Sequence, residues 1–179
     1  MTYSVKNVKT FNTPDGGGYN ASFYCGKTKV ANIHDGGFGG CLEYDWVDTT
    51  IGRTGKINPD QHFEKDFYAF LKTHKIPDFE WDSEKRKFVD IPNQFRTPTD
   101  DLFVGNLVRD FDDMKLLKRE LKKEVLVVKH DKGTVHGTGD KPTPENVAQY
   151  VEVALKEGMN MSILNSLPLE EAWEIWRNR

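Results

Sequence analysis

The chain has 179 residues, of which 37% are hydrophobic, 12% aromatic and 30% charged, and its formal net charge is −3. This apolar content suffices for a folded core and excludes a disordered chain. A mean hydropathy of −0.66, with no apolar run near the length of a bilayer span, excludes a transmembrane helix. The slightly acidic balance excludes a generally basic, histone-like nucleic-acid coat.

The first third of the sequence predicts an antiparallel β-meander from Tyr3 to Trp46. Val5 and Val8 begin a strand, and the turn residues 14–18 end it. Two further strands flank a Gly-Lys-Thr turn, and a last short strand alternates apolar and acidic residues up to Trp46. Alternation of this kind is typical of strands with one buried face.

The strands on either side of the Gly-Lys-Thr turn can pair in two registers. A two-residue turn pairs Phe23 with the residue before Ala31, whereas a three-residue 26–28 loop pairs Phe23 with Ala31 and Ala21 with Ile33. Because a slip of one residue exchanges the two faces of a strand, burial favours the second register, which gathers these four apolar side chains on one face.

Helical patterns dominate the rest of the chain. Asn58 as N-cap and Pro59 at the first position open a helix over 60–74. Residues 76–99 include three prolines and predict a long, irregular connection, whereas 124–129 carry the strongest buried-strand pattern. Further helices are expected over 113–123, 143–158 and 169–177.

These patterns predict an α+β fold, with an N-terminal antiparallel β-meander packed with about four helices and a second short strand pair near 124–138. We expect a single domain over 1–179, strand-rich over 1–57 and mainly helical over 58–179. Because the N-terminus lacks the apolar segment of a secretory signal and two cysteines make no disulfide framework, we expect a cytoplasmic protein.

A glycine-rich segment, residues 35–40, is the most unusual local feature. A phosphate-binding loop normally enters a helix N-terminus, but this segment leads into a strand, and its glycine spacing fits no nucleotide motif. It is better interpreted as a flexible hairpin loop that presents Phe38 between Gly37 and Gly39. An aromatic side chain held on glycines is a candidate contact for a partner.

Charge is segregated along the chain. Residues 76–113, which include Trp81 and Asp82, carry ten acidic against five basic residues, whereas residues 114–141 carry eight basic against four acidic ones. The bases recur at helical spacing and form one flank of the expected helix over 113–123. A flank of this kind could follow a nucleic-acid backbone, although interleaved glutamates favour a solvated helix face. The basic residues of this flank are Lys115, Lys118, Arg119, Lys122 and Lys123.

His130 and His136 flank a predicted hairpin turn and are the best catalytic candidates, because imidazole acts as a base or metal ligand near neutral pH. A two-residue 132–133 turn would point the two rings to opposite faces. A three-residue 132–134 loop would place them directly opposite each other. An atypical hydrolase or metalloenzyme would need the second arrangement.

Two groups of side chains could bind a metal in principle. Asp110, Asp112 and Asp113 lie within four residues, but acidic residues at a helix N-terminus explain them without an ion. Cysteines and a histidine also occur on neighbouring predicted strands, too far apart along those strands to converge. We therefore expect no metal and no cofactor. The residues of this second group are Cys25, His34 and Cys41.

The segment from Tyr19 to Gly40, with its strand, short basic turn, strand and Gly-Gly loop, resembles uncharacterised small proteins of bacteriophages and bacterial mobile elements. The resemblance to these proteins extends to three later segments: the strand over 125–128, the helix opened by Thr-Pro and the sequence Ile163-Leu164-Asn165. The resemblance implies an accessory protein in the cytoplasm of an infected or element-bearing bacterium. Such proteins often bind host or defence machinery stoichiometrically.

The combined expectation is a non-enzymatic binding protein that engages a host or defence protein and has no catalytic residues. The expected interface combines the loop around Phe38 with the acidic segment, since segregated charge suits electrostatically steered contacts. Nucleic-acid binding by the helix over 113–123, or hydrolysis using His130 and His136, are the alternatives. The expected interface residues are Gly37, Phe38, Gly39, Trp81 and Asp82.

Overall fold

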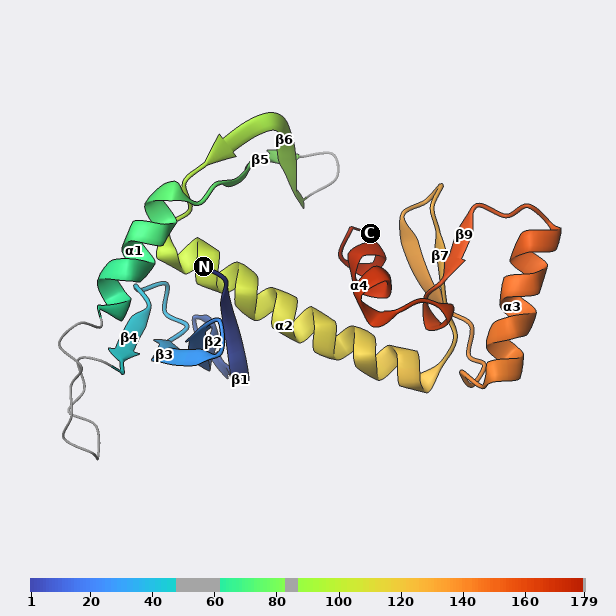
Figure 1. Cartoon of the computed structure of the whole chain (residues 1–179), viewed down its shortest axis with the longest axis horizontal. Coiled ribbons are helices and arrows are strands. Elements are labelled where there is room, and N and C mark those ends of the chain that lie inside the picture. Colours follow the sequence, from blue (N-terminus) through green and yellow to red (C-terminus); the bar gives the residue numbers. More distant parts are fainter. Residues whose placement is uncertain (48–61, 83–86, 179) are drawn as a thin grey trace. The chain divides into compact units, whose positions relative to one another are not determined.

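The computed structural model describes residues 1–47, 62–82 and 87–178, and the chain divides into two compact units, residues 1–111 and 112–179. The fold is α+β, as predicted (Figure 1). The strand-rich part was expected to end at residue 57, but the first unit continues to residue 111. It does so because two helices, α1 and the first half of α2, supply apolar side chains to the core of the N-terminal sheet. These helices are α1 (Phe63–Thr73) and α2 (Asp100–Lys123).

The N-terminal sheet confirms the predicted meander. Its strands lie in the order β1-β2-β3-β4, and all neighbours are antiparallel. One face is buried by the two helices: Phe23 and Phe67 are fully buried with their rings 5.0 Å apart, and Val104 of α2 is also fully buried. The strands are β1 (Tyr3–Thr13), β2 (Gly16–Cys25), β3 (Thr28–Asp35) and β4 (Glu43–Trp46).

The predicted register between β2 and β3 is confirmed, but a β-bulge produces it rather than a three-residue loop. Phe23 pairs with Ala31 as expected, whereas Cys25 pairs with Thr28, so the turn contains two residues. Val30 lies between the two registers and is 1% exposed. The extra residue therefore adds an apolar side chain to the core while the flanking pairs keep their faces.

β1 contains a second bulge at Asn7, whose φ is 54°. Val5 and Val8 are three residues apart, so regular alternation would place them on opposite faces. The register shift between Lys6 and Lys9 allows both valines to pack against the core. The same shift places both lysines on the opposite face of the sheet.

The helix predicted over 60–74 begins at Phe63 within the described residues, and Asn58 and Pro59 lie outside them. The apolar residues of α1 form one stripe, since Phe67 and Leu71 are buried and the flanking Phe63 and Phe70 pack against the same core. The stripe therefore attaches α1 to the sheet.

The irregular connection predicted over 76–99 is a β-hairpin. Strands β5 (Ile76–Asp82) and β6 (Lys87–Arg96) pair antiparallel, with a bulge after Pro77. Arg96 lies 3.9 Å from the centre of the Phe79 ring and stabilises the ribbon. Prolines are tolerated because both strands of a two-stranded ribbon are edges, where a missing N–H need not break a ladder bond.

The helix predicted over 113–123 begins thirteen residues earlier, at Asp100. The N–H of Leu102 donates to Oγ1 of Thr99 at 3.3 Å, so Thr99 caps this helix. Neither Asp110 nor Asp112 is a cap, because both lie inside the helix. The Pro-Thr-Asp sequence before residue 101 is the stronger start signal.

The second unit is built on a three-stranded antiparallel sheet with the order β8-β7-β9. Side chains of the central strand β7 alternate between two cores. Val127 packs with α3, whereas Leu126 and Val128 pack with α4 and the last turns of α2. The elements are β7 (Leu126–Lys129), β8 (Thr134–Gly137), α3 (Pro144–Lys156), β9 (Met161–Ile163), η1 (Leu164–Ser166) and α4 (Leu169–Arg177).

The two C-terminal helices agree with their sequence signals. Thr143 caps α3, accepting from the N–H of Asn146, and Gly158 follows its end with φ 60°. Val147, Tyr150 and Val151 of α3 pack against the core, whereas its other large apolar residue near the C-terminus, Leu155, is 78% exposed. Trp176 of α4 is buried in the core that this helix forms with β7 and the last turns of α2.

Asn165 joins three parts of the second unit through its side chain. Its Oδ1 accepts from the N–H of Leu126 at 2.7 Å, and its Nδ2 donates to the carbonyls of Leu121 at 2.9 Å and Glu124 at 3.2 Å. These bonds satisfy the end of α2 and the start of β7 with one amide.

Candidate functional site

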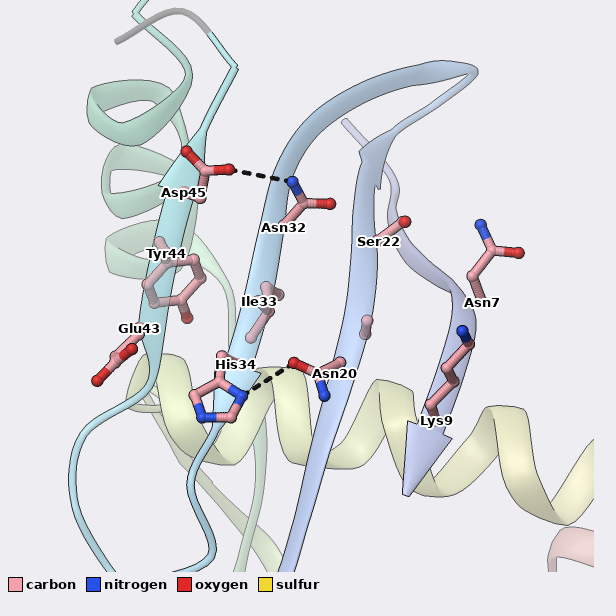
Figure 2. Close-up of a pocket in the computed structure, with 11 residues that line it drawn as sticks. Asn7, Lys9, Asn20, Ser22, Asn32, Ile33, His34, Glu43, Tyr44 and Asp45 are labelled. Atoms are coloured by element: carbon pink, nitrogen blue, oxygen red, sulfur yellow. Dashed lines mark hydrogen bonds between the residues drawn. The ribbon is translucent and has the colours of Figure 1, made fainter. Parts of the chain in front are cut away.

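The face of the β1–β4 sheet that the helices leave uncovered carries two rows of polar side chains (Figure 2). Each row contains one residue from every strand, because the residues are direct cross-strand partners. All of the row residues except Lys6 line a shallow concavity of about 450 Å³. In the order β1 to β4, the first row is Lys9, Asn20, His34 and Glu43, and the second is Lys6, Ser22, Asn32 and Asp45.

Hydrogen bonds fix the central side chains of both rows. Nδ1 of His34 donates to Oδ1 of Asn20 at 2.9 Å, so in the tautomer that carries its hydrogen on Nδ1 the other ring nitrogen, Nε2, is an acceptor. Nδ2 of Asn32 donates to Oδ2 of Asp45 at 3.1 Å. The dashed lines in Figure 2 mark these two bonds, which lie across neighbouring strands.

Both rows have the same electrostatic polarity. The lysines lie on β1, the carboxylates of Glu43 and Asp45 lie on β4, and neutral polar groups lie between them. The bulge at Asn7 makes this possible, since it brings Lys6 and Lys9 to one face. A surface with this pattern is electrostatically complementary to one that carries the opposite charges at the two facing edges.

Aromatic rings border the first row. The ring of Phe11 stacks on His34 with centroids 5.9 Å apart and 18° between planes. Gly18 leaves room for this ring, because a Cβ at that position would collide with it. Phe38 is 67% exposed, and its ring and Nε2 of His34 both lie beside Gly36. The exposed Phe38 therefore lies next to the polar rows.

The base of the glycine-rich loop is fixed to the sheet. The N–H of Gly37 donates to Oδ1 of Asp35 at 2.8 Å, and its carbonyl accepts from Oγ1 of Thr13 at 3.1 Å. Gly37 has φ +73°, and a Cβ there would lie 2.9 Å from the backbone nitrogen of Gly18. A side chain at Gly37 would displace the loop, whereas Gly39 has open space around it.

Trp81 and Asp82, the other predicted interface residues, end β5, which belongs to a different sheet from Phe38. Their side chains lie outside the described residues. Trp81 and Asp82 are therefore not included in the candidate site.

The predicted basic flank lies in the last turns of α2, and all five of its side chains are exposed. Two of them form ion pairs: Nη2 of Arg119 lies 3.0 Å from Oε1 of Glu120, and Nζ of Lys123 lies 2.9 Å from Oε1 of Glu124. The glutamates noted in the sequence therefore neutralise part of this flank. Unpaired positive charge is left on Lys115, Lys118 and Lys122 within the part of the chain that the structure describes.

The two histidine candidates do not form a pair. Lys129 pairs with Thr134, so the turn has four residues and includes His130, unlike either predicted turn. Nε2 of His130 lies 2.8 Å from Oγ of Ser162 on β9, whereas His136 lies on β8, at the other edge of the sheet. The arrangement that a catalytic pair requires is absent from these described strands.

No group of three or more His, Cys, Asp or Glu side chains within the described ranges could hold a metal ion. Asp110, Asp112 and Asp113 lie in the middle of α2, so the helix-start explanation for them is also wrong. Across the same ranges, no helix combines the length and apolar character needed to cross a bilayer.

Tyrosines around the N-terminus of α2 have raised pKa values. Burial and the nearby Asp100 carboxylate raise the pKa of Tyr68 to about 12, and the same causes raise the pKa of Tyr44 further. Both phenols therefore stay protonated at neutral pH and can act as hydrogen-bond donors but not as phenolate nucleophiles.

The sequence predicted a partner contact at Phe38, which stays a prediction, and did not predict the polar rows beside it. The signal was present, because polar residues occupy alternate positions of the predicted strands opposite the apolar ones. What the sequence did not give was the alignment of four strands and the Asn7 bulge. The chain matches no protein-family model, and neither the curated proteins nor the solved structures include a match to it.

Proposed function

We propose that this protein is a non-enzymatic binding protein that engages a partner protein through the open face of its N-terminal sheet and the adjoining Phe38. The observation that carries the proposal is the pair of complete polar rows beside a 67% exposed aromatic ring. Polar groups around an exposed aromatic residue are typical of protein interfaces, where aromatic anchors supply much of the binding energy.

The mixed charge of the face favours a protein over a nucleic acid. Phosphates would gain from Lys6 and Lys9 but would be repelled by Glu43 and Asp45 at the other edge. A protein surface can present bases and acids together. The proposed target is a host or defence protein and the proposed location the cytoplasm, as the resemblance to phage and mobile-element proteins implies.

The alternatives have less support. Pairing of Arg119 and Lys123 with glutamates reduces the charge available to a nucleic acid on α2. Separation of His130 from His136 removes the paired site that a hydrolase would use.

The test is affinity capture from a bacterial lysate, treated with nuclease and read by mass spectrometry. Phe38→Ala is compared with Phe95→Ala, a matched control, because Phe95 is also an exposed phenylalanine (64%) but lies on β6. We expect one near-stoichiometric protein whose recovery falls at least about fivefold with Phe38→Ala, in line with loss of an aromatic anchor, and is unchanged with Phe95→Ala. Capture that nuclease abolishes, or that Phe38→Ala leaves unaltered, would contradict the proposal.

A further inference from the structure

We propose that the open face also binds the open face of a second copy of this chain, in a weak symmetric dimer that competes with the partner protein. The inference rests on the proposed function in so far as it assigns a regulatory role to the same face. It starts from one observation, that both rows run from lysine on β1 to a carboxylate on β4.

A surface with this polarity is complementary to itself under one rotation. A two-fold axis that runs parallel to the strands, between β2 and β3, turns the face over and places β1 of one copy above β4 of the other. Lys9 then lies above Glu43 of the second copy, and Glu43 above its Lys9. Lys6 likewise lies above the second copy's Asp45.

The centre of the first row is complementary under the same rotation. Asn20 lies above His34 of the second copy, where the free amide Nδ2 can donate to the acceptor Nε2 that the Asn20–His34 bond leaves on the ring. Facing sheets pack about 10 Å apart, a gap that side chains from two opposed faces span together. The first row therefore meets its own copy with donors against acceptors.

The charge pattern also selects this axis over the other one available. A two-fold axis perpendicular to the strands would place β1 above β1, with lysines facing lysines and carboxylates facing carboxylates. Like charges face to face disfavour that arrangement. The dimer therefore has one expected orientation, in which each strand runs in the same direction as its equivalent in the second copy and antiparallel to the strand that it faces.

The dimer is expected to be weak. Four strands about 4.8 Å apart and two rows of side chains cover less than the roughly 800 Å² per partner of a standard interface. The contacts are polar and exposed, so salt screens them. A contact of this strength shields the face at high local concentration and releases it to a protein partner.

The test is sedimentation equilibrium of the full chain from about 1 µM to about 1 mM, at about 50 mM and about 500 mM salt. The informative variants are Lys9→Glu and Glu43→Lys, two exposed positions in the same row. We expect wild-type protein to dimerise reversibly at low salt and less at high salt. Each variant alone should dimerise at least about tenfold more weakly, because both symmetric contacts become repulsive.

An equimolar mixture of the two variants provides the decisive arm. In the Lys9→Glu variant both ends of the first row are acidic, and in the Glu43→Lys variant both ends are basic. Opposite charges therefore face each other at both ends, so a heterodimer should form with about wild-type affinity. Recovery of this complex also shows that both variants are folded. Lys115→Glu, on the exposed flank of α2, is the control and should dimerise as wild type does.

Three results would overturn the dimer: a wild-type chain that stays monomeric throughout, a variant that self-associates as wild type does, or a mixture that gives no heterodimer. Affinity capture is run at concentrations below the dimerisation range. If the chain stays monomeric at every concentration in sedimentation but still captures its partner, the dimer alone is refuted. Absence of any partner together with salt-sensitive dimers refutes the proposed function alone.

Discussion

Asn7 is the residue on which the geometry of the open face depends, and replacing it tests that dependence. Its φ of 54° lies in the left-handed region, which costs an ordinary L-residue about 1–2 kcal/mol and a glycine almost nothing. Asn7→Val, with a β-branched side chain, should therefore lower the free energy of unfolding by about 1–2 kcal/mol. Asn7→Gly should stay within about 0.5 kcal/mol of the wild type.

The assay is urea denaturation followed by circular dichroism, with Asn12→Val as the matched control. Asn12 is an exposed asparagine of the same strand whose φ is not positive, so valine there should cost little. A second readout is dimerisation, which should weaken with Asn7→Val because loss of the bulge would turn Lys6 or Lys9 away from the face. Equal stability of Asn7→Val and Asn12→Val would refute the reasoning.

Three predictions concern the second unit. Asn165→Ala removes three hydrogen bonds and strands a buried backbone N–H, so urea denaturation should show a loss of about 2–3 kcal/mol. Gly137→Ala should cost about 1 kcal/mol or less in the same assay, because the new Cβ would displace only the end of the Glu124 side chain and its hydrogen bond to the N–H of Gly139. Hydrogen bonding to Lys123 and to a backbone N–H lowers the pKa of Glu124, so this carboxylate stabilises the fold above its unfolded pKa. Glu124→Gln should therefore melt below the wild type at pH 7, and the difference should shrink once the pH falls below the unfolded pKa and disappear below the lowered pKa of Glu124 in the folded chain.

Local sequence signals were sufficient where neighbours in the chain decide the structure. Thr143 followed by proline, and Gly158 fifteen residues later, bound α3 correctly, because caps act within one turn. Alternation in the first 46 residues predicted the meander for a similar reason, since the period of two follows from the strand itself.

Signals failed where two local patterns compete. The acidic residues near 110 resemble a helix start, but Thr99 supplies an earlier cap and the helix continues through them. The prolines of residues 76–99 resemble a loop, but an edge ribbon tolerates them.

The sequence by itself therefore determined the α+β class, the apolar faces of the strands and most helix ends, because burial and capping are local or periodic. Only the tertiary structure decided how those strands align. The bulges at Asn7 and Val30 shift the register by one residue, and burial of the valines on the core face is the reason for the shift. That shift brings Lys6, Lys9 and the polar side chains of three other strands into two rows, which no local pattern specifies.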